Sequence, residues 1–126
     1  MTVDILLQRE PIVLKTDVPP EAGAVVRFEG RVRATEQGHT IRALVYEAYQ
    51  PMAERQIEKI LRELGAKHPC LSVRVRHRLG EVPVGDIAIA VETLAAHRAE
   101  AFALTAAFMD RLKQDVPIWK MKAVDA

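Results

Sequence analysis

The sequence has 126 residues, 49% hydrophobic and 28% charged, a length and composition typical of a soluble globular protein with one domain spanning residues 1–126. Its 18 Lys and Arg residues against 17 Asp and Glu give a formal net charge of +1, which excludes coating of nucleic acid or an anionic membrane through bulk electrostatics. A single cysteine excludes an intramolecular disulfide and a cysteine-based zinc site.

The first part of the chain predicts three strands. Residues 2–8 are predicted to form a short strand. The first residues of the chain show neither a basic region nor a small-residue cleavage site, so we expect no signal peptide and a reduced, cytoplasmic protein. Residues 23–33 alternate with a period of two, which indicates a half-buried strand. The polar stretch 34–40 predicts a mobile loop, across which residues 41–48 form a strand that can pair with 23–33 as a hairpin.

The middle of the chain predicts a helix followed by two strands. Pro51 suits a first helical position, and apolar residues follow it at helical spacing. Residues 71–78 alternate again, a turn-rich stretch follows, and residues 86–94 are more continuously apolar, which indicates a central strand. The apolar residues of the helix are Met52, Ile57, Ile60, Leu61 and Leu64.

A second helix is predicted from about residue 96 to 114, and a last strand over residues 118–124, beyond Pro117. Strands outnumber helices and two strand pairs are hairpin-like. We therefore predict an α+β fold with a mostly antiparallel sheet and two main helices. The expected apolar stripe of the second helix is Phe102, Ala106, Met109 and Leu112.

Motifs of the common catalytic classes are missing from the sequence. No glycine loop has a phosphate-binding spacing, and Ser72, the only serine, falls in the middle of a predicted strand. The four histidines have no metal-ligand spacing, so we expect no metal and no cofactor. Cys70 is more typical of a buried or bystander thiol than of a nucleophile.

Two groups of basic residues are candidates for an anion site. Arg31 and Arg33 share a strand face beside the predicted loop, and His97 and Arg98 open the second helix, where free N–H groups favour an anion. Each group has a structural alternative. Arginines on a strand face protect an edge or stay solvated, and a polar pair at a helix start is often only surface polarity.

Three lysines form a further candidate group near the C-terminus. Lys113 falls near the end of the second helix, and Lys120 and Lys122 share one face of the last strand. An extended link would separate Lys113 from Lys120 by ~23 Å, but a turn at Pro117 can bring both ammonium groups to one site. A helix-end lysine also complements the helix dipole without any ligand. The pattern alone thus supports a small α+β domain with a candidate anion site.

Four stretches of this sequence, in their order and spacing, resemble the large, catalytic subunit of molybdopterin synthase, over roughly four-fifths of the chain. The resemblance implies an α/β-hammerhead-type fold. The stretches are GAVVRFEGRVR (23–33), YEAYQPMAERQIEKI (46–60), HRLGEVPVGDIAIAV (77–91) and AHRAEAFALTAAFMDRLKQDVPIWK (96–120).

The resemblance also implies an activity and partners. In that family two large subunits form a homodimer within a heterotetramer, and each binds a small ubiquitin-like subunit whose C-terminal Gly-Gly tail ends in a thiocarboxylate. The tail delivers sulfur to cyclic pyranopterin monophosphate, and two transfers create the dithiolene of molybdopterin. A sulfurtransferase whose sulfur belongs to its partner needs no reactive cysteine and no resident metal.

The resemblance assigns roles to nine residues. Lys120 matches the more direct catalytic lysine and Lys113 the supporting one. The substrate-binding positions are Arg31, Val32, Arg33, His97 and Arg98, the last two contributed across the dimer interface. Phe28 and Met109 match positions near the partner tail, and are otherwise ordinary core residues.

The sequence departs from the family pattern in two places. Lys122 stands where many members carry an acidic residue, and the chain ends at Ala126, where many continue into a longer tail. We expect these differences to affect partner affinity and pocket closure more than the chemistry. Two alternatives therefore stay open: a non-catalytic paralogue that binds the ubiquitin-like partner, and a domain that binds an anionic small molecule.

Overall fold

A computed structural model describes all 126 residues and contains eight strands and two helices. Neither helix is long and apolar enough to cross a membrane. In chain order the elements are β1 (Thr2–Gln8), β2 (Ala24–Arg31), β3 (Thr35–Glu36), β4 (His39–Ala48), α1 (Met52–Lys67), β5 (Ser72–Arg78), β6 (Gly80–Pro83), β7 (Ile87–Ala95), α2 (Arg98–Asp115) and β8 (Ile118–Asp125).

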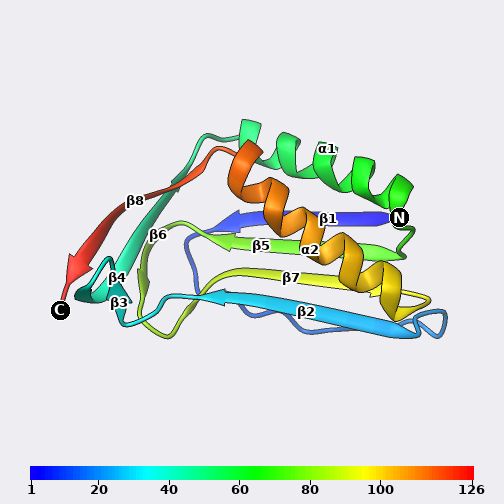
Figure 1. Ribbon diagram of the computed structural model, residues 1–126, viewed down its shortest axis with the longest axis horizontal. Coiled ribbons are helices and arrows are strands. Elements are labelled where there is room, and N and C mark those ends of the chain that lie inside the picture. The colour runs from blue at the N-terminus through cyan, green and yellow to red at the C-terminus, as the bar shows by residue number, and fades with distance from the viewer.

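The strands form two sheets that meet end to end (Figure 1). The first has the order β1-β5-β7-β2, in which β1 and β5 run parallel and the other pairs antiparallel. In the second, β4 pairs antiparallel with β3, β6 and β8. The predicted α+β fold with a mostly antiparallel sheet is confirmed, and β7 lies inside its sheet as its apolar run indicates.

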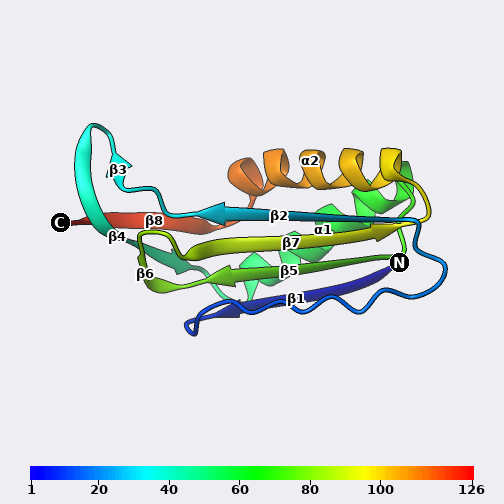
Figure 2. The same cartoon turned by 90° about the horizontal axis from the view of Figure 1, so that it is seen from below.

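Both helices pack on one face of the first sheet, where they enclose the main hydrophobic core (Figure 2). The α1 side chains predicted from helical spacing supply much of this core, except Met52, which is exposed. The predicted stripe of α2 is largely wrong, because Phe102 is 60% exposed and Leu104 and Phe108 are buried instead. This helix is rich in alanine, so its apolar periodicity is weak and packing on the sheet decides which side is buried.

The strand pairing around residues 30–48 differs from the prediction. β2 pairs with β7 rather than with β4, and residues 34–40 form the short β3–β4 hairpin rather than a mobile loop. Gln37 and Gly38 turn that hairpin with φ of 49° and 81°, the left-handed conformation that a two-residue turn requires. The reversal directs β4 into the second sheet, away from the edge of β2. The turn-rich stretch before β7 likewise contains a strand, β6.

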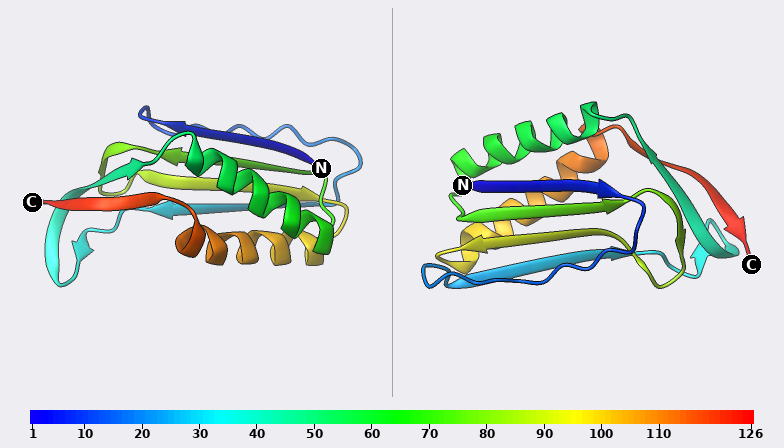
Figure 3. Two further views of the ribbon diagram at one scale, coloured as in Figure 1. Left: turned by 90° about the horizontal axis from the view of Figure 1, so that it is seen from above. Right: turned by 180° about the vertical axis from the view of Figure 1, so that it is seen from behind.

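Residues 9–23, which we call the strap, cross the face of the first sheet that the helices leave open (Figures 2 and 3). Ile12 and Leu14 pack there against Ala90 of β7. The guanidinium groups of Arg27 and Arg74 donate hydrogen bonds to backbone carbonyls of the strap. The sheet therefore has two faces of different character, one under the helices and one under the strap.

Candidate active site

A cavity of about 220 Å³ lies where the C-terminal end of α2 meets the two sheets. Lys113 and Lys120 both line it, so the turn at Pro117 brings the two lysines together as predicted. We call this cavity the lysine pocket. Its other lining residues are Tyr46, His77, Ile89, Met109, Leu112 and Ile118.

The end of α2 and the start of β8 position the two lysines. Lys113 lies in the last turn of the helix, which ends where the Val116 N–H donates to the carbonyl of Leu112. Pro117 cannot continue a helix, and β8 starts at the next residue. Lys120 then lies opposite Tyr46 in the β4–β8 register.

The electrostatic surroundings of the two lysines differ. The Nζ of Lys120 lies 3.3 Å from a carboxylate oxygen of Glu36 on β3. Lys113 is exposed at the end of the helix and makes no ion pair within the chain. The register of β8 shifts after Lys120, so that Lys122 faces Val45. This irregularity interrupts the alternation of side chains on which the predicted shared face of Lys120 and Lys122 depends.

Two neutral polar side chains, Tyr46 and His77, complete the lysine pocket. Their rings meet edge to face, with centroids 5.1 Å apart and an interplanar angle of 67°. Burial lowers the pKa of His77, against the opposing effect of its hydrogen bond to the carbonyl of Arg78. Because that carbonyl can only accept, Nδ1 carries the proton of the neutral ring. Burial, with a smaller contribution from the charge of Glu36, raises the pKa of Tyr46.

Three residues of the site, Tyr46, His77 and Glu36, were not predicted from the sequence. A signal for His77 was present, because it continues the apolar face of Val73 and Val75 on β5, and a histidine in such a row is buried. The contacts of Tyr46 and Glu36 depend on pairing between β4, β3 and β8, which local patterns do not reveal. The pocket thus combines two cations with a neutral imidazole and a protonated phenol.

Apolar residues extend the floor of the lysine pocket towards the edge of the first sheet. Met109 lines the pocket, and Phe28 lies beside Gly30 on β2. A Cβ at Gly30 would lie 2.8 Å from Ile89, another lining residue, and 3.5 Å from the ring of Phe28. The glycine therefore lets the side chain of Ile89 pack directly against the β2 backbone, next to the ring of Phe28. Of the two residues predicted to lie near the partner tail, Met109 thus lines the pocket and Phe28 lies on β2, 38% exposed.

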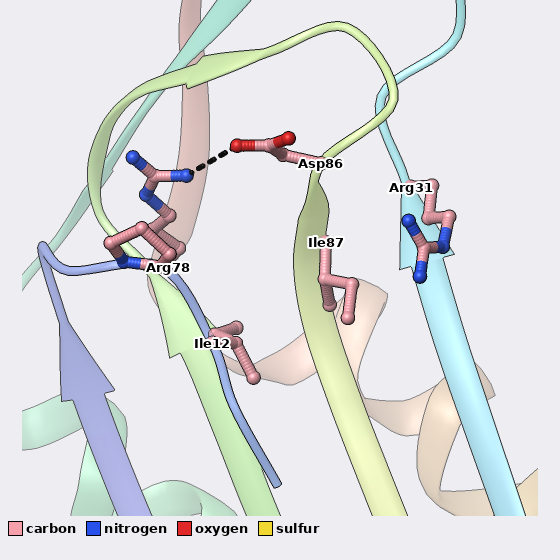
Figure 4. A pocket seen from close by; sticks show the side chains of 6 residues that line it. Ile12, Arg31, Arg78, Asp86 and Ile87 are labelled. Carbon is pink, nitrogen blue, oxygen red and sulfur yellow. Dashed lines mark hydrogen bonds and ion pairs between the residues drawn. The ribbon is translucent and has the colours of Figure 1, made fainter.

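Arg31 lies apart from the lysines, in a second cavity of about 190 Å³ on the strap side of the sheet (Figure 4). There it hydrogen-bonds to the carbonyl of Gly85 and pairs with Glu29 at 2.8 Å. Across β7 from Arg31, Arg78 points at Asp86, with a separation of 2.9 Å (Figure 4). Both guanidinium groups of this cavity are therefore already paired with partners in the chain.

The remaining predicted substrate-binding residues are also not gathered around the lysines. Val32 is buried, 3% exposed, and its side chain packs in the core of the second sheet. Arg33 is exposed in the link between β2 and β3. His97 and Arg98 are exposed at the start of α2, roughly 22 Å along the helix from Lys113. Their contribution to a site across a dimer interface stays a prediction.

Cys70 lies outside the lysine pocket, with its sulfur 3.6 Å from the carbonyl of Glu100. Burial, with a smaller contribution from the charge of Glu100, raises the pKa of this thiol. A thiol that resists ionisation is a poor nucleophile, so the structure supports the bystander role.

Comparison with known proteins agrees with the resemblance seen in the sequence. The chain is 44% identical over 101 residues to molybdopterin synthase catalytic subunit 1 of Mycobacterium tuberculosis, covering 80% of this chain and 69% of that protein. It is 40% identical over 103 residues to the human molybdopterin synthase catalytic subunit, covering 82% and 55%. The crystal structure of molybdopterin synthase from Staphylococcus aureus matches with a TM-score of 0.86 at 34% identity, over 95% of this chain and 90% of that one. A family model described as MoaE protein matches residues 7–115, and the chain belongs to that family.

Proposed function

We propose that this chain is the catalytic subunit of a molybdopterin synthase and acts as a sulfurtransferase. It transfers sulfur from the thiocarboxylated C-terminus of a small ubiquitin-like subunit to cyclic pyranopterin monophosphate. The observation that carries the proposal is the lysine pocket, in which two lysines from α2 and β8 converge over an apolar floor. The names of the relatives support the same activity.

The charges of the pocket suit a thiocarboxylate. Lys120 neutralises the anionic end of the tail and stabilises the oxyanion that develops when the acyl carbon–sulfur bond breaks. Lys113 supports it with a second positive charge that no carboxylate of the chain occupies. The thiocarboxylate sulfur bonds to a carbon of the pterin substrate and displaces an oxygen substituent from it, which gives a thioester. Water then adds to the acyl carbon, the acyl carbon–sulfur bond breaks, the tail leaves as an ordinary carboxylate and the sulfur stays on the pterin as a thiolate.

The small volume of the lysine pocket, about 220 Å³, suits a tail without side chains. In this proposal a Gly-Gly terminus reaches the lysines along the apolar floor of the pocket past Met109, with Phe28 on the neighbouring strand. For the pterin substrate we propose contacts from Arg33 and from His97 and Arg98 of a second copy, since α2 places this pair far from the lysines of its own chain. The proposed assembly is a cytoplasmic heterotetramer built around a homodimer in which residues 1–126 act as one domain.

The test is reconstitution of the chain with its thiocarboxylated partner and cyclic pyranopterin monophosphate. The wild-type protein should yield molybdopterin, and Lys120→Ala should lower the rate at least about 100-fold. Lys59→Ala removes an exposed lysine from α1 and should leave the rate unchanged. Full activity of Lys120→Ala would refute the site assignment. Tight partner binding without any product would instead favour the non-catalytic paralogue, the alternative that Lys122 motivates.

A further inference from the structure

The hydroxyl of Tyr46 belongs to the same cluster as the ammonium of Lys120. The two residues lie opposite each other in the β4–β8 register, and both line the lysine pocket. Glu36 connects them. Its carboxylate lies 3.3 Å from the Nζ of Lys120, and its charge contributes to the raised pKa of Tyr46. Because directly opposed residues of an antiparallel pair project to the same face, the side chains of Tyr46 and Lys120 share one wall of the pocket.

The ring of Tyr46 is held in place from several sides. It packs against both the main core and the core of the second sheet, and His77 meets it edge to face. The imidazole is itself held by its hydrogen bond to the Arg78 carbonyl. A ring fixed in this way presents its hydroxyl at one position, which is the condition for a preorganised hydrogen-bond donor.

The Tyr46 hydroxyl has no hydrogen-bond partner within the chain. Burial, assisted by the charge of Glu36, raises the pKa of a group that is already protonated at neutral pH. The phenol therefore keeps its proton and is available as a donor. A half-buried donor without a partner in the chain is suited to a ligand that brings its own acceptor.

We propose that the Tyr46 hydroxyl donates a hydrogen bond to the anionic group that Lys120 binds, and so forms a third polar contact of the site. The inference rests on the proposed function, because it takes the carboxylate or thiocarboxylate end of the partner tail as that group. Tyr46 supplies a directed hydrogen bond, whereas the lysines supply charge. His77 acts through Tyr46 as a positioning residue.

The first part of the test measures binding without turnover. A synthetic peptide that ends in Gly-Gly with a free carboxylate is titrated into the full chain by calorimetry. Tyr46→Phe keeps the ring and removes only the hydroxyl, so affinity should fall about 10–100-fold while the melting temperature stays the same. Tyr49→Phe is the matched control, because Tyr49 is 62% exposed and does not line the pocket. It should bind the peptide like the wild-type protein.

The second part measures sulfur transfer by the same variants in the reconstituted complex. Tyr46→Phe should lower kcat by about 10–100-fold, a change larger than that in KM, because the bond strengthens as charge develops on the acyl oxygen. If the peptide binds more weakly to Tyr46→Phe but no variant transfers sulfur, the donor role stands and the proposed function fails. If transfer occurs and Tyr46→Phe matches the wild-type protein in both assays, the donor role is wrong. A wild-type protein that neither binds the peptide nor transfers sulfur would overturn both.

Discussion

The two faces of the β1-β5-β7-β2 sheet both carry positive charge but differ in how that charge is paired. On the strap side, five arginines bond to carboxylates or backbone carbonyls of the chain. On the helix side, Lys113 has no such partner and Lys120 has one half-buried carboxylate, that of Glu36. The paired arginines are Arg27, Arg31, Arg74, Arg76 and Arg78.

This difference shows why counting basic residues does not locate a site. A guanidinium that already holds a carboxylate and a carbonyl has little left to offer a ligand. Three of the five, Arg27, Arg74 and Arg78, donate to backbone carbonyls of the strap and so attach it to the sheet. An ammonium without a partner gains its interaction only when an anion arrives. The pairing state of a cation, rather than its presence, separates the structural face from the functional one.

The largest effect on stability should come from breaking a pair on the strap side. Glu92 is only 1% exposed, and it pairs with Arg74 at 3.6 Å and accepts a hydrogen bond from Thr16 of the strap. Arg74→Met keeps an apolar stem but leaves the buried carboxylate without its cation. We expect a loss of about 3 kcal/mol in the free energy of unfolding, measured by urea denaturation at pH 7.

The double variant Arg74→Met, Glu92→Gln provides the control for that loss. It removes the charge that Arg74→Met leaves unpaired, and the amide oxygen can still accept from Thr16. Most of the lost stability should return. If the double variant is as unstable as the single one, the cost lies in packing of the arginine stem and the face is not held together by charge pairing.

On the helix side, the expected effect is on activity rather than on stability. Lys113→Ala should lower sulfur transfer about 100-fold, because it removes the unpaired charge from the pocket. The free energy of unfolding should change by less than about 0.5 kcal/mol. Lys67→Ala is a matched control, since Lys67 also lies in the last turn of a helix and makes the same interaction with the helix dipole. A loss of stability in Lys113→Ala beyond that of Lys67→Ala would show a structural role.

The sequence predicted the elements of the fold better than their partners. Periodicity located both helices and most strands, because burial on one face imposes a pattern within each segment. It could not show that β2 pairs with β7, since that contact joins residues some sixty positions apart. The same limit explains the error over residues 34–40, where two residues with positive φ turn a polar stretch into a hairpin.

The candidate site was predicted in the same uneven way. The convergence of Lys113 and Lys120 followed from a turn between neighbouring elements, helped by the family resemblance. Arg31 was predicted to belong to the same site as the lysines, but it lies on the strap side of the sheet. Alternation along β2 separates the two faces of the strand without indicating which face the helices cover. Tyr46 and Glu36 reach Lys120 only through the pairing of three strands, so no local pattern could have identified them.

The buried histidine gives the helix side a pH dependence of its own. Because burial lowers the pKa of His77 in the folded protein, the unfolded chain binds more protons as the pH falls through the ordinary value of 6.5. Stability is therefore complete above that pH and is lost below it, by at most about 1.4 kcal/mol per pH unit. Melting temperatures of wild type and His77→Leu between pH 7.5 and about 5 would test this, since only the variant should stay flat. On the strap side, the lowered pKa of Asp4 affects the stability only below about pH 4, where this carboxylate would bind a proton in the unfolded chain.

The smallest expected effect concerns the one ion pair of the lysine pocket. The side chains of Lys120 and Glu36 are 53% and 24% exposed, so Glu36→Gln should change the free energy of unfolding by less than about 1 kcal/mol. The variant nevertheless removes a carboxylate that competes with an incoming anion for Lys120. The Gly-Gly peptide should bind about two- to fivefold more tightly, with the advantage shrinking at high salt. Weaker binding would show instead that Glu36 orients Lys120, and the helix side would then resemble the strap side in depending on a pair within the chain.

An alkaline titration of the Tyr46 phenol gives a second measurement on Glu36→Gln. The pKa of Tyr46 should fall in this variant, because the charge of Glu36 is removed and only the effect of burial remains.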